Sequence, residues 1–428
     1  MREKELKVRL SEAEYENFDR ICSFSNVRPA QKARELILEY VQQKGLSMHK
    51  LKFKPSSCES LPRLEPGRPL RVGEMFCGPG GIGVALNRVK SENYRFIHSW
   101  ATDWDQDTCR TFERNILSET PEAHCICADV RELDIGSLPV VDGFLYGFPC
   151  NDFSLVGESK GLEGDYGGLF SYGVRYIKRA NPLFFFAENV SGLSSANDGK
   201  AFKVILEALN NAGEFGYTIT ANLYKFEQYG VPQARHRYIL IGIRGDLGME
   251  FKVPAPSGRI KSCREALQDI PVWAANQEKT AQTKRVMERL ARIPEGMNVW
   301  QAEEAGLLPP ELCLNVRGAR LSQIYRRLDS DKPAYTITGS GGGGTHVYHW
   351  KENRALTNRE RARLQTFPDD FVFMGNKESV RKQIGMAVPC DGAAVILEAL
   401  LKTFEGREYD SVEPSVGVYK ARTYHPDL

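Results

Sequence analysis

The chain of 428 residues has no hydrophobic run that approaches the roughly 20 residues of a membrane-spanning helix, and the run at residues 183–187 is far too short. It also lacks a secretory signal, because residues 1–5 are mostly charged. Its 10 cysteines form no CxxC pair, which argues against zinc and against a disulfide framework. These absences exclude membrane and secreted proteins. We expect reduced thiols, no metal and a cytoplasmic location.

The overall composition is that of a soluble globular enzyme, with 42% hydrophobic, 26% charged and 10% aromatic residues. The net charge of +2 hides an uneven distribution. Residues 1–54 and 255–365 each carry more basic than acidic side chains, and the rest of the chain is acidic. Two mildly basic segments beside an acidic body suit a polyanionic partner.

The pattern around residue 150 organises the rest of the chain. Residues 140–147 predict a buried strand that runs into a glycine. Cys150 follows just past the strand's C-terminal end, where open α/β sheets bind their ligands. Pro149 restricts the backbone beside the thiol. A cysteine is usually a small buried hydrophobe, but this position makes Cys150 a candidate nucleophile.

A glycine-rich loop follows an earlier predicted strand, residues 70–76, and leads into a helix. Bare backbone at a helix N-terminus lets a ligand approach closely. The glycines also satisfy GxGxxG, with Asp103 at the spacing of a dinucleotide site, so the loop alone does not distinguish NAD from another adenosine cofactor. The loop residues that we expect at the cofactor are Phe76, Gly78, Gly80 and Gly81.

Two further predicted strands also end in carboxylates. The first offers Asp103 for ribose hydroxyls and Trp104 for stacking, and Asp129 ends the next. A lone aspartate at a strand end is often only a helix cap. The carboxyl ends of neighbouring parallel strands meet at one edge, however, so we expect these residues to share a site.

An acid and two arginines complete the candidate chemistry. A fifth strand, residues 183–187, delivers Glu188 beside the strand that precedes Cys150. A carboxyl after a buried apolar run is costly to ionise without a partner, which raises its pKa and suits proton donation, although most such acids are structural. Arg235 and Arg237 stand two apart on a predicted strand, so we expect both to point into a cleft.

Residues 1–48 predict a separate module. Residues 4–10 alternate like a half-buried strand, a capping box at Ser11 and Glu14 begins a helix, and a second amphipathic helix follows. Strand–helix–helix resembles the ribbon-helix-helix family of DNA-binding dimers, which implies a homodimer through this module. A helical cap packed on the body of the protein is an equally open interpretation.

Taken together, the stretches from about residue 70 to 402 resemble the DNA cytosine-5 methyltransferase family. Each motif is weak alone, but their order along the chain is the family's order. The resemblance implies S-adenosyl-L-methionine as cofactor, with Pro149 and Val388 as further contacts, and double-stranded DNA as substrate. The matching stretches are the Phe76 loop, Asp103 with Trp104, Asp129, Pro149-Cys150, Glu188-Asn189-Val190, Gln233-x-Arg235-x-Arg237, residues 359–369 and Gly385-x-Ala387-Val388-Pro389.

The resemblance implies a nucleophilic mechanism on a base flipped out of the duplex. Cys150 adds to carbon 6 of cytosine, protonated Glu188 holds ring N3, and carbon 5 takes the methyl group. Arg235 and Arg237 are expected to hold the nucleotide's backbone and carbonyl oxygen. The chain also departs from the family pattern, with Asn151 in place of Gln and Met386 in place of Asn. These departures affect hydrogen bonding near the thiol and a polar contact near the cofactor.

The resemblance and the periodicity together give a domain plan. The fold class expected is α/β, a doubly wound, mostly parallel Rossmann-like sheet with a smaller domain whose basic, aromatic and glycine-rich loops favour recognition over a core. Residues 357–367 predict a helix, and residues 379–402 predict a strand followed by a helix. The expected segments are a linker at 49–69, a catalytic domain at 70–254, a target-recognition domain at 255–375, a returning catalytic segment at 376–405 and a tail at 406–428.

The function expected is a sequence-specific bacterial methylase, nucleoid-associated, of a restriction-modification system or without one, and autoregulated through residues 1–48. An NAD-linked oxidoreductase is the first alternative, but it does not explain Cys150, Glu188 and the arginine motif as a set. A DNA-binding regulator with an inactive methylase body is the second. Intact Cys150 and Glu188 argue against it.

Overall fold

The computed structural model describes residues 61–148, 168–190, 200–315, 321–342 and 344–421. The chain divides into two units, Met1–Pro55 and Ser56–Leu428, and all of the described residues belong to the second. The predicted module at 1–48 lies outside the described residues, as do Pro149, Cys150 and Asn151. Predictions about them remain predictions.

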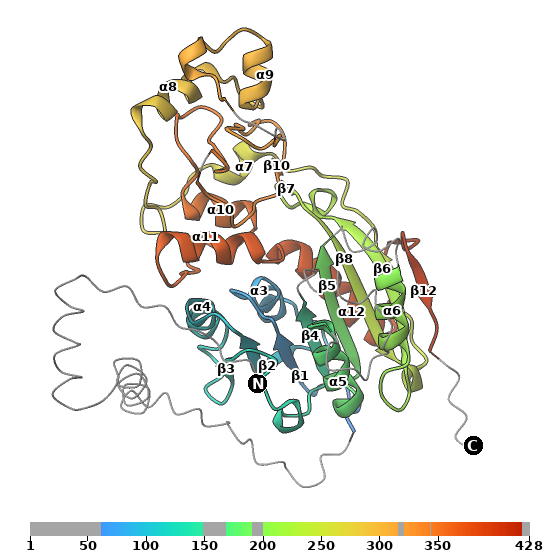
Figure 1. Ribbon diagram of the computed structural model, residues 1–428. Coiled ribbons are helices and arrows are strands. Elements are labelled where there is room, and N and C mark those ends of the chain that lie inside the picture. Colours follow the sequence, from blue (N-terminus) through green and yellow to red (C-terminus); the bar gives the residue numbers. More distant parts are fainter. Residues whose placement is uncertain (1–60, 149–167, 191–199, 316–320, 343, 422–428) are drawn as a thin grey trace, which may run out of the picture. The chain divides into compact units, whose positions relative to one another are not determined.

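A sheet of eight strands, in the order β12-β6-β8-β5-β4-β1-β2-β3, forms the centre of the fold (Figure 1). Strands β3, β2, β1, β4 and β5 run parallel, and β8, β6 and β12 continue the sheet antiparallel. The predicted doubly wound, mostly parallel sheet is therefore confirmed. The strands are β1 (Leu70–Met75), β2 (Phe96–Asp103), β3 (His124–Cys127), β4 (Gly143–Gly147), β5 (Phe184–Val190), β6 (Tyr217–Lys225), β8 (His236–Arg244) and β12 (Gly417–Tyr419).

The strand order reverses between β1 and β4, which are neighbours in the sheet but not in the sequence. Val72 pairs with Gly143 and Met75 with Tyr146, so the two strands end level with each other. From β1 the chain proceeds to β2 on one side, and from β4 to β5 on the other. The ends of β1 and β4 thus form the topological switch point, where doubly wound sheets bind ligands.

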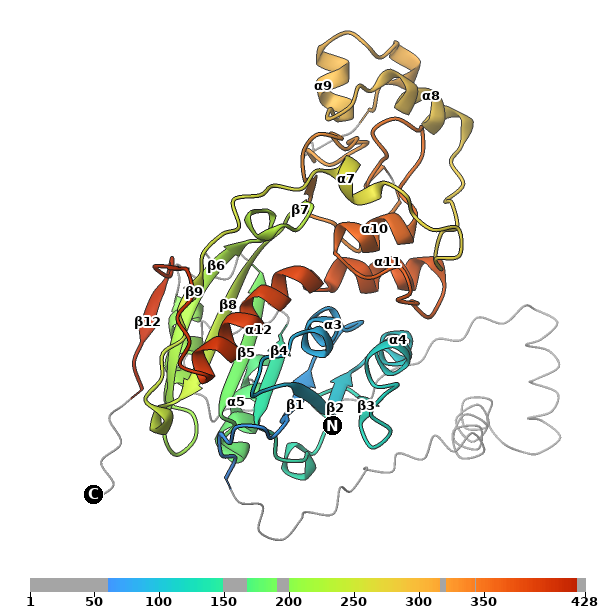
Figure 2. The same ribbon diagram turned by 180° about the vertical axis from the view of Figure 1, so that it is seen from behind.

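Helices cover both faces of the sheet. One face carries α3 (Gly81–Arg88), α4 (Gln106–Ile116) and α12 (Cys390–Phe404), and Figure 2 shows α12 lying across the strands. Ile82 and Leu86 of α3 share a buried cluster with Ile396 and Leu400 of α12. The other face carries α5 (Phe170–Ala180) and α6 (Lys200–Asn210), and the ring of Tyr176 in α5 packs on those of Trp100 and Phe144.

Residues 379–402 form helix, not a strand followed by a helix. The first helix, α11, spans Lys377–Met386, and α12 begins at Cys390 after a break at Val388 and Pro389. Residues 377–404 together have the length and composition of a membrane span, but 67% of the most apolar window is buried inside the fold. That burial is typical of core helices. The expected strand fails because Val380 and Ile384 supply an apolar stripe with helical spacing.

The segment between β8 and α11 has a core of its own, which corrects the prediction of loops without one. Its cluster includes Leu290, Val299, Trp300, Tyr325 and Tyr348. The aromatic and basic residues that suggested only loops are partly absorbed in this cluster. The helix predicted at 357–367 forms as α10, with the capping box between Thr357 and Glu360. The elements are α7 (Cys263–Leu267), α8 (Lys284–Arg292), α9 (Val299–Glu304), α10 (Asn358–Leu364), the pair β7 (Gln233–Ala234) and β10 (Ala334–Tyr335), and the pair β9 (Val253–Pro254) and β11 (Ser411–Val412).

Candidate active site

The loop after β1 is held in an unusual backbone shape. Phe76 has φ 57°, in the left-handed region that a bulky residue rarely adopts, at a typical cost of about 1–3 kcal/mol. Gly78 and Gly80 also have positive φ, at 56° and 102°. The amide of Cys77 donates to the carbonyl oxygen of Thr102 at 3.0 Å, which fastens the loop to β2. The surrounding fold therefore fixes the loop's path.

Two glycines at the start of α3 leave no room for a side chain. A Cβ atom at Gly81 would lie 2.1 Å from the carbonyl oxygen of Val388, and one at Gly80 would lie 2.8 Å from a side-chain carbon of Ile116. The C-terminal segment is therefore packed directly on the loop. No described side chain caps α3, so its first amide groups can receive an acceptor from a ligand.

Asp103, at the end of β2, joins the loop to the neighbouring strand. Its carboxylate accepts the amide of Gly78 at 3.0 Å on one oxygen and the amide of Asp105 at 3.0 Å on the other. The side chain is buried, and burial raises the pKa of Asp103. A carboxylate has about four acceptor positions, so its oxygens can still accept from a hydroxyl of a ligand.

Trp104 and Asp129 differ in their accessibility to a ligand. Trp104 is 75% exposed, which is unusual for an indole and leaves its ring open to stacking. The carboxylate of Asp129 accepts from Nε of Arg131 at 2.9 Å and from the amide of Arg131 at 3.0 Å. Asp129 is therefore engaged with Arg131, and a ligand would have to share it.

The loop and its neighbours fit an adenosine-type cofactor on the geometry alone. The bare backbone of Gly78, the carboxylate of Asp103 and the exposed ring of Trp104 all lie at the carboxyl ends of β1 and β2. They offer, respectively, close approach, acceptors for hydroxyls and a stacking surface.

Glu188 lies within β5, where it is paired with Gly147, the last residue of β4. Its Oε1 lies 2.8 Å from Nε of Arg237 on the adjacent strand β8, and both side chains are nearly buried. The sequence suggested an acid without a compensating charge. The structure supplies that charge, and the pair stands directly beside the strand end that leads toward residue 150.

Arg235 does not share the direction of Arg237, which corrects that prediction. It precedes β8 and is fully buried. Its Nη1 donates to the carbonyl oxygen of Ile337 and its Nη2 to that of Gly385, both at 3.0 Å. Burial lowers the pKa of Arg235 to about 9. Its guanidinium ties β8 to the end of α11, whereas Arg237 alone faces Glu188.

Two buried amides have positioning roles that the sequence analysis did not assign. Nδ2 of Asn189 donates to the carbonyl oxygen of Phe148 at 2.9 Å, and Phe148 is the last described residue before Pro149. Nε2 of Gln233 donates to Oε1 of Gln365 at 3.0 Å, between β7 and the end of α10. For Asn189 the signal was a polar side chain at the end of an apolar strand, which usually needs a specific partner, whereas Gln233 stands in a polar stretch that gave no such signal.

Known proteins resemble this chain in sequence and in fold. The family profile for the C-5 cytosine-specific DNA methylase matches residues 70–402. The chain is 56% identical over 354 residues to the type II methyltransferase M.BbvI of Brevibacillus brevis, covering 80% of this chain and 93% of the relative. It is 36% identical to the type II methyltransferase M.NgoFVII of Neisseria gonorrhoeae, covering 80% and 89%.

The chain belongs to the C-5 cytosine-specific DNA methylase family. It is a DNA (cytosine-5-)-methyltransferase and uses S-adenosyl-L-methionine. Solved structures share the methyltransferase fold. A DNA modification methyltransferase from an Escherichia coli prophage has a TM-score of 0.55 at 22% identity, covering 78% of this chain and 99% of that one. The methyltransferase EhMeth of Entamoeba histolytica has a TM-score of 0.54 at 15% identity, covering 80% and 100%.

Proposed function

We propose that this methyltransferase modifies cytosine within a specific DNA sequence through a covalent adduct with Cys150, as the modification enzyme of a bacterial restriction-modification system. The observation that carries the proposal is the Glu188–Arg237 pair, which lies beside the end of β4 at the topological switch point. The type II names of the relatives M.BbvI and M.NgoFVII support the restriction-modification role. Such an enzyme works on DNA at the nucleoid.

In the proposed reaction, the thiolate of Cys150 adds to carbon 6 of the cytosine, and the electron pair of the ring moves toward carbon 5 and N3. Glu188 donates a proton at N3, which makes the ring a better acceptor. After carbon 5 has gained the methyl group, its hydrogen leaves as a proton to water, N3 returns its proton to Glu188, and the bond to the thiolate breaks. This route divides one difficult substitution into two easier steps.

Arg237 orients this acid. It has donors beyond those that bind Glu188 and the carbonyl oxygen of His236, and we assign them to the carbonyl oxygen of the cytosine. Asn189 holds Phe148 and so anchors the start of the segment that carries Cys150. Arg235 acts through the backbone of residues 337 and 385 and is a positioning residue.

The cofactor groups proposed are Phe76, Gly78, Gly80, Gly81, Asp103, Trp104, Asp129, Pro149 and Val388. When bound, S-adenosyl-L-methionine supplies an electrophilic methyl group. Asp103 would accept ribose hydroxyls, and Trp104 would cover the adenine ring. Because thiol and methyl donor must both reach the cytosine ring, the base must leave the duplex, at a cost of a few kcal/mol.

Transfer of tritium from methyl-labelled cofactor to duplex DNA, followed by sequencing of the modified bases, tests this function. We expect label on carbon 5 of cytosine within one short sequence. Label distributed over all cytosines would contradict sequence specificity, and label on another atom would contradict the chemistry.

We also propose that residues 1–48 form a dimeric DNA-binding arm that regulates the protein's own gene. The family match begins at residue 70, so this segment is additional to the shared enzyme. A protein beginning at Leu51 should methylate DNA at a near-normal rate but lose self-association and promoter binding. Equal promoter affinity with and without residues 1–48, at matched salt, would leave only the helical-cap interpretation.

A further inference from the structure

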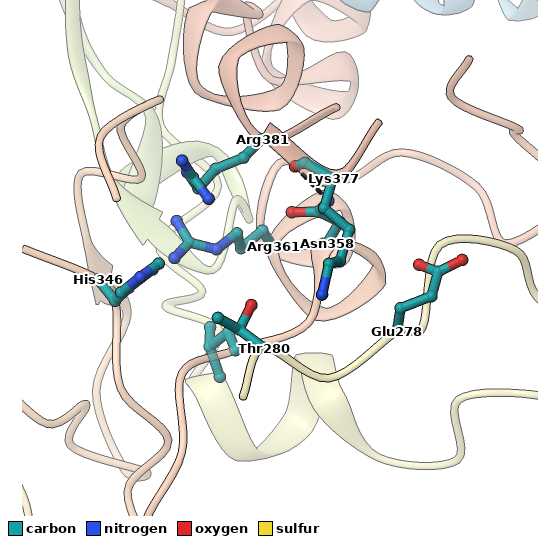
Figure 3. Close-up of a pocket in the computed structure, with 8 residues that line it drawn as sticks. Glu278, Thr280, His346, Asn358, Arg361, Lys377 and Arg381 are labelled. Atoms are coloured by element: carbon teal, nitrogen blue, oxygen red, sulfur yellow. Dashed lines mark hydrogen bonds between the residues drawn. The ribbon is translucent and has the colours of Figure 1, made fainter. Parts of the chain in front are cut away.

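A polar pocket that the methyl-transfer chemistry does not use lies between α10, α11 and the chain before α8 (Figure 3). Its enclosed space is about 10 Å³, room for about one water or one oxygen of an anion, and its walls are almost entirely polar. Arg361, Arg381, Lys377 and His346 supply basic groups to it. The remaining lining residues are Glu278, Thr280, Leu356 and Asn358.

Arg361 is the anomaly in this pocket. Its side chain is 1% exposed, yet none of its three guanidinium nitrogens has a hydrogen-bond partner among the described residues. In Figure 3 its guanidinium points toward Arg381 and His346. Burial, and then the nearby charge of Arg381, lowers the pKa of Arg361 to about 10. A buried charge without a partner is costly, so this arrangement calls for a compensating anion.

The other basic groups are fixed around the same point. Nε of Arg381 donates to the carbonyl oxygen of Gly339 at 3.3 Å, and a Cβ atom at Gly341 would lie 2.3 Å from the Cζ of Arg381. Burial, followed by the charges of Arg361 and Arg381, lowers the pKa of His346 to about 4. The imidazole is therefore neutral near pH 7, and a bound anion would favour its protonated form.

The acidic and neutral lining groups do not neutralise Arg361. Glu278 lies on the far side of Asn358 from the guanidinium (Figure 3). Nδ2 of Asn358 donates to the carbonyl oxygen of Lys377 at 3.0 Å. The carboxylate of Glu378 lies 3.8 Å from Nη2 of Arg381, on the exposed side of α11. Two guanidiniums and an imidazole facing one small polar space suit the oxygens of a tetrahedral anion.

We propose that the Arg361 pocket is a phosphate-binding site in the small domain, filled by a backbone phosphate of DNA or by free phosphate. The DNA source is favoured because the pocket adjoins the glycine-rich chain at Gly339 and Gly341, within the predicted recognition region. A phosphate contact there would fix the position of the domain on the duplex without reading sequence. The site does not involve Cys150 or Glu188.

The first test compares the full-length protein with Arg361→Met, which removes the charge and keeps most of the volume. Arg292→Met, at an exposed position of α8, is the matched control. In buffer without multivalent anions, Arg361→Met should melt at the same temperature as wild type or higher, because an uncompensated buried charge has been removed. Inorganic phosphate, at constant ionic strength, should raise the Tm of wild type and Arg292→Met but not of Arg361→Met.

The second test uses the wild-type protein, so it does not depend on whether a variant folds. In wild type labelled at the histidine Cε1 positions, phosphate should raise the pKa of His346 from about 4 toward the ordinary histidine range. Arg361 and Arg381 are the charged groups that act on the imidazole. Lys377 and Glu278 also line the pocket, and the contribution of Glu278 is checked with Glu278→Gln.

DNA binding distinguishes the two sources. If a DNA phosphate fills the pocket, Arg361→Met should reduce the slope of log affinity against log salt by about 0.9. If the slope is unchanged and phosphate still raises the Tm of wild type, the pocket binds free phosphate and not a phosphate of DNA. The proposal is overturned if phosphate leaves the pKa of His346 unchanged and protects wild type and Arg361→Met equally. A Tm of Arg361→Met below wild type in anion-free buffer also overturns it, because a group of the chain itself would then neutralise Arg361.

Discussion

The carboxylate of Glu188 lies 2.8 Å from Nε of Arg237, at the edge of the sheet where β4 ends. The substitution Glu188→Gln keeps a group that can hydrogen-bond ring N3 but removes the transferable proton. We expect kcat to fall about 10²- to 10⁴-fold, with DNA affinity nearly unchanged. Single-turnover methyl transfer measures the effect.

Asp246→Asn is the control for that experiment, because Oδ1 of Asp246 lies 2.7 Å from Nε of Arg244 and forms a comparable pair at the opposite end of β8 from Arg237. It should leave the rate near that of wild type. Wild-type turnover in Glu188→Gln would remove Glu188 from the mechanism.

Gly81 is the second residue whose identity the structure explains in detail. In Gly81→Ala the new methyl group would lie 2.1 Å from the carbonyl oxygen of Val388, so α3 and the C-terminal segment must separate. We expect weaker binding of S-adenosyl-L-methionine, measured by calorimetry. Gly136→Ala, in a 3-10 turn between β3 and β4, should bind the cofactor normally. Equal affinities in the two variants would mean that the Val388 contact does not shape the cofactor site.

At the scale of elements, two buried arginines predict opposite outcomes for the same substitution. Arg235 donates to carbonyl groups at Ile337 and Gly385, whereas Arg361 has no partner among the described residues. Arg235→Met leaves those carbonyls unpaired and should lower the free energy of unfolding by about 1–3 kcal/mol. Denaturant unfolding in anion-free buffer measures this, and Arg361→Met should show no loss.

The same variant separates the two roles considered for Arg235. Below its melting temperature, Arg235→Met should retain more methyl transfer than Arg237→Met, because only Arg237 contacts the catalytic acid. A larger loss of rate in Arg235→Met than in Arg237→Met, with the protein folded, would mean that Arg235 does contact the nucleotide.

Much of the element plan follows from the sequence. Strands β4 and β5 are short apolar runs that end at Gly147 and Glu188-Asn189-Val190, and such runs are informative because both faces of a central parallel strand are buried. Residues 379–402 were misassigned because Val388 and Pro389 interrupt two helices and mimic the start of a strand. The separate cluster around Trp300 was missed because its members lie far apart in the sequence.

The site was predicted in part, and what was missed depends on tertiary contacts. Glycine spacing and strand ends identified the loop at Gly78 and the carboxylate of Asp103, which the structure joins by a hydrogen bond. No local pattern reveals that Arg237 pairs with Glu188 while Arg235 turns to Gly385, because both depend on strand and helix packing. Arg361 was passed over because a basic residue on a short helix usually faces water.

At the scale of the whole molecule, the hydrophobic cluster between residues 286 and 355 defines a region that can be exchanged. Replacing residues 284–355 with the matching segment of the relative M.NgoFVII carries this cluster intact and leaves α10 and α11 in place. We expect the hybrid to methylate the relative's sequence, read by bisulfite sequencing. A folded, active hybrid that still marks the original sequence would place recognition elsewhere.

The attack of Cys150 on carbon 6 of cytosine is tested most directly by trapping the adduct on duplex DNA that carries 5-fluorocytosine at the target site. Fluorine cannot leave as a cation, so after methyl transfer the bond to the thiol cannot break. Mass spectrometry of the digested wild-type complex should find the modified, methylated base on the peptide that contains Cys150, and Cys150→Ser should form no adduct. Methyl transfer without any adduct in wild type, or an adduct on another residue, would exclude Cys150 as the nucleophile.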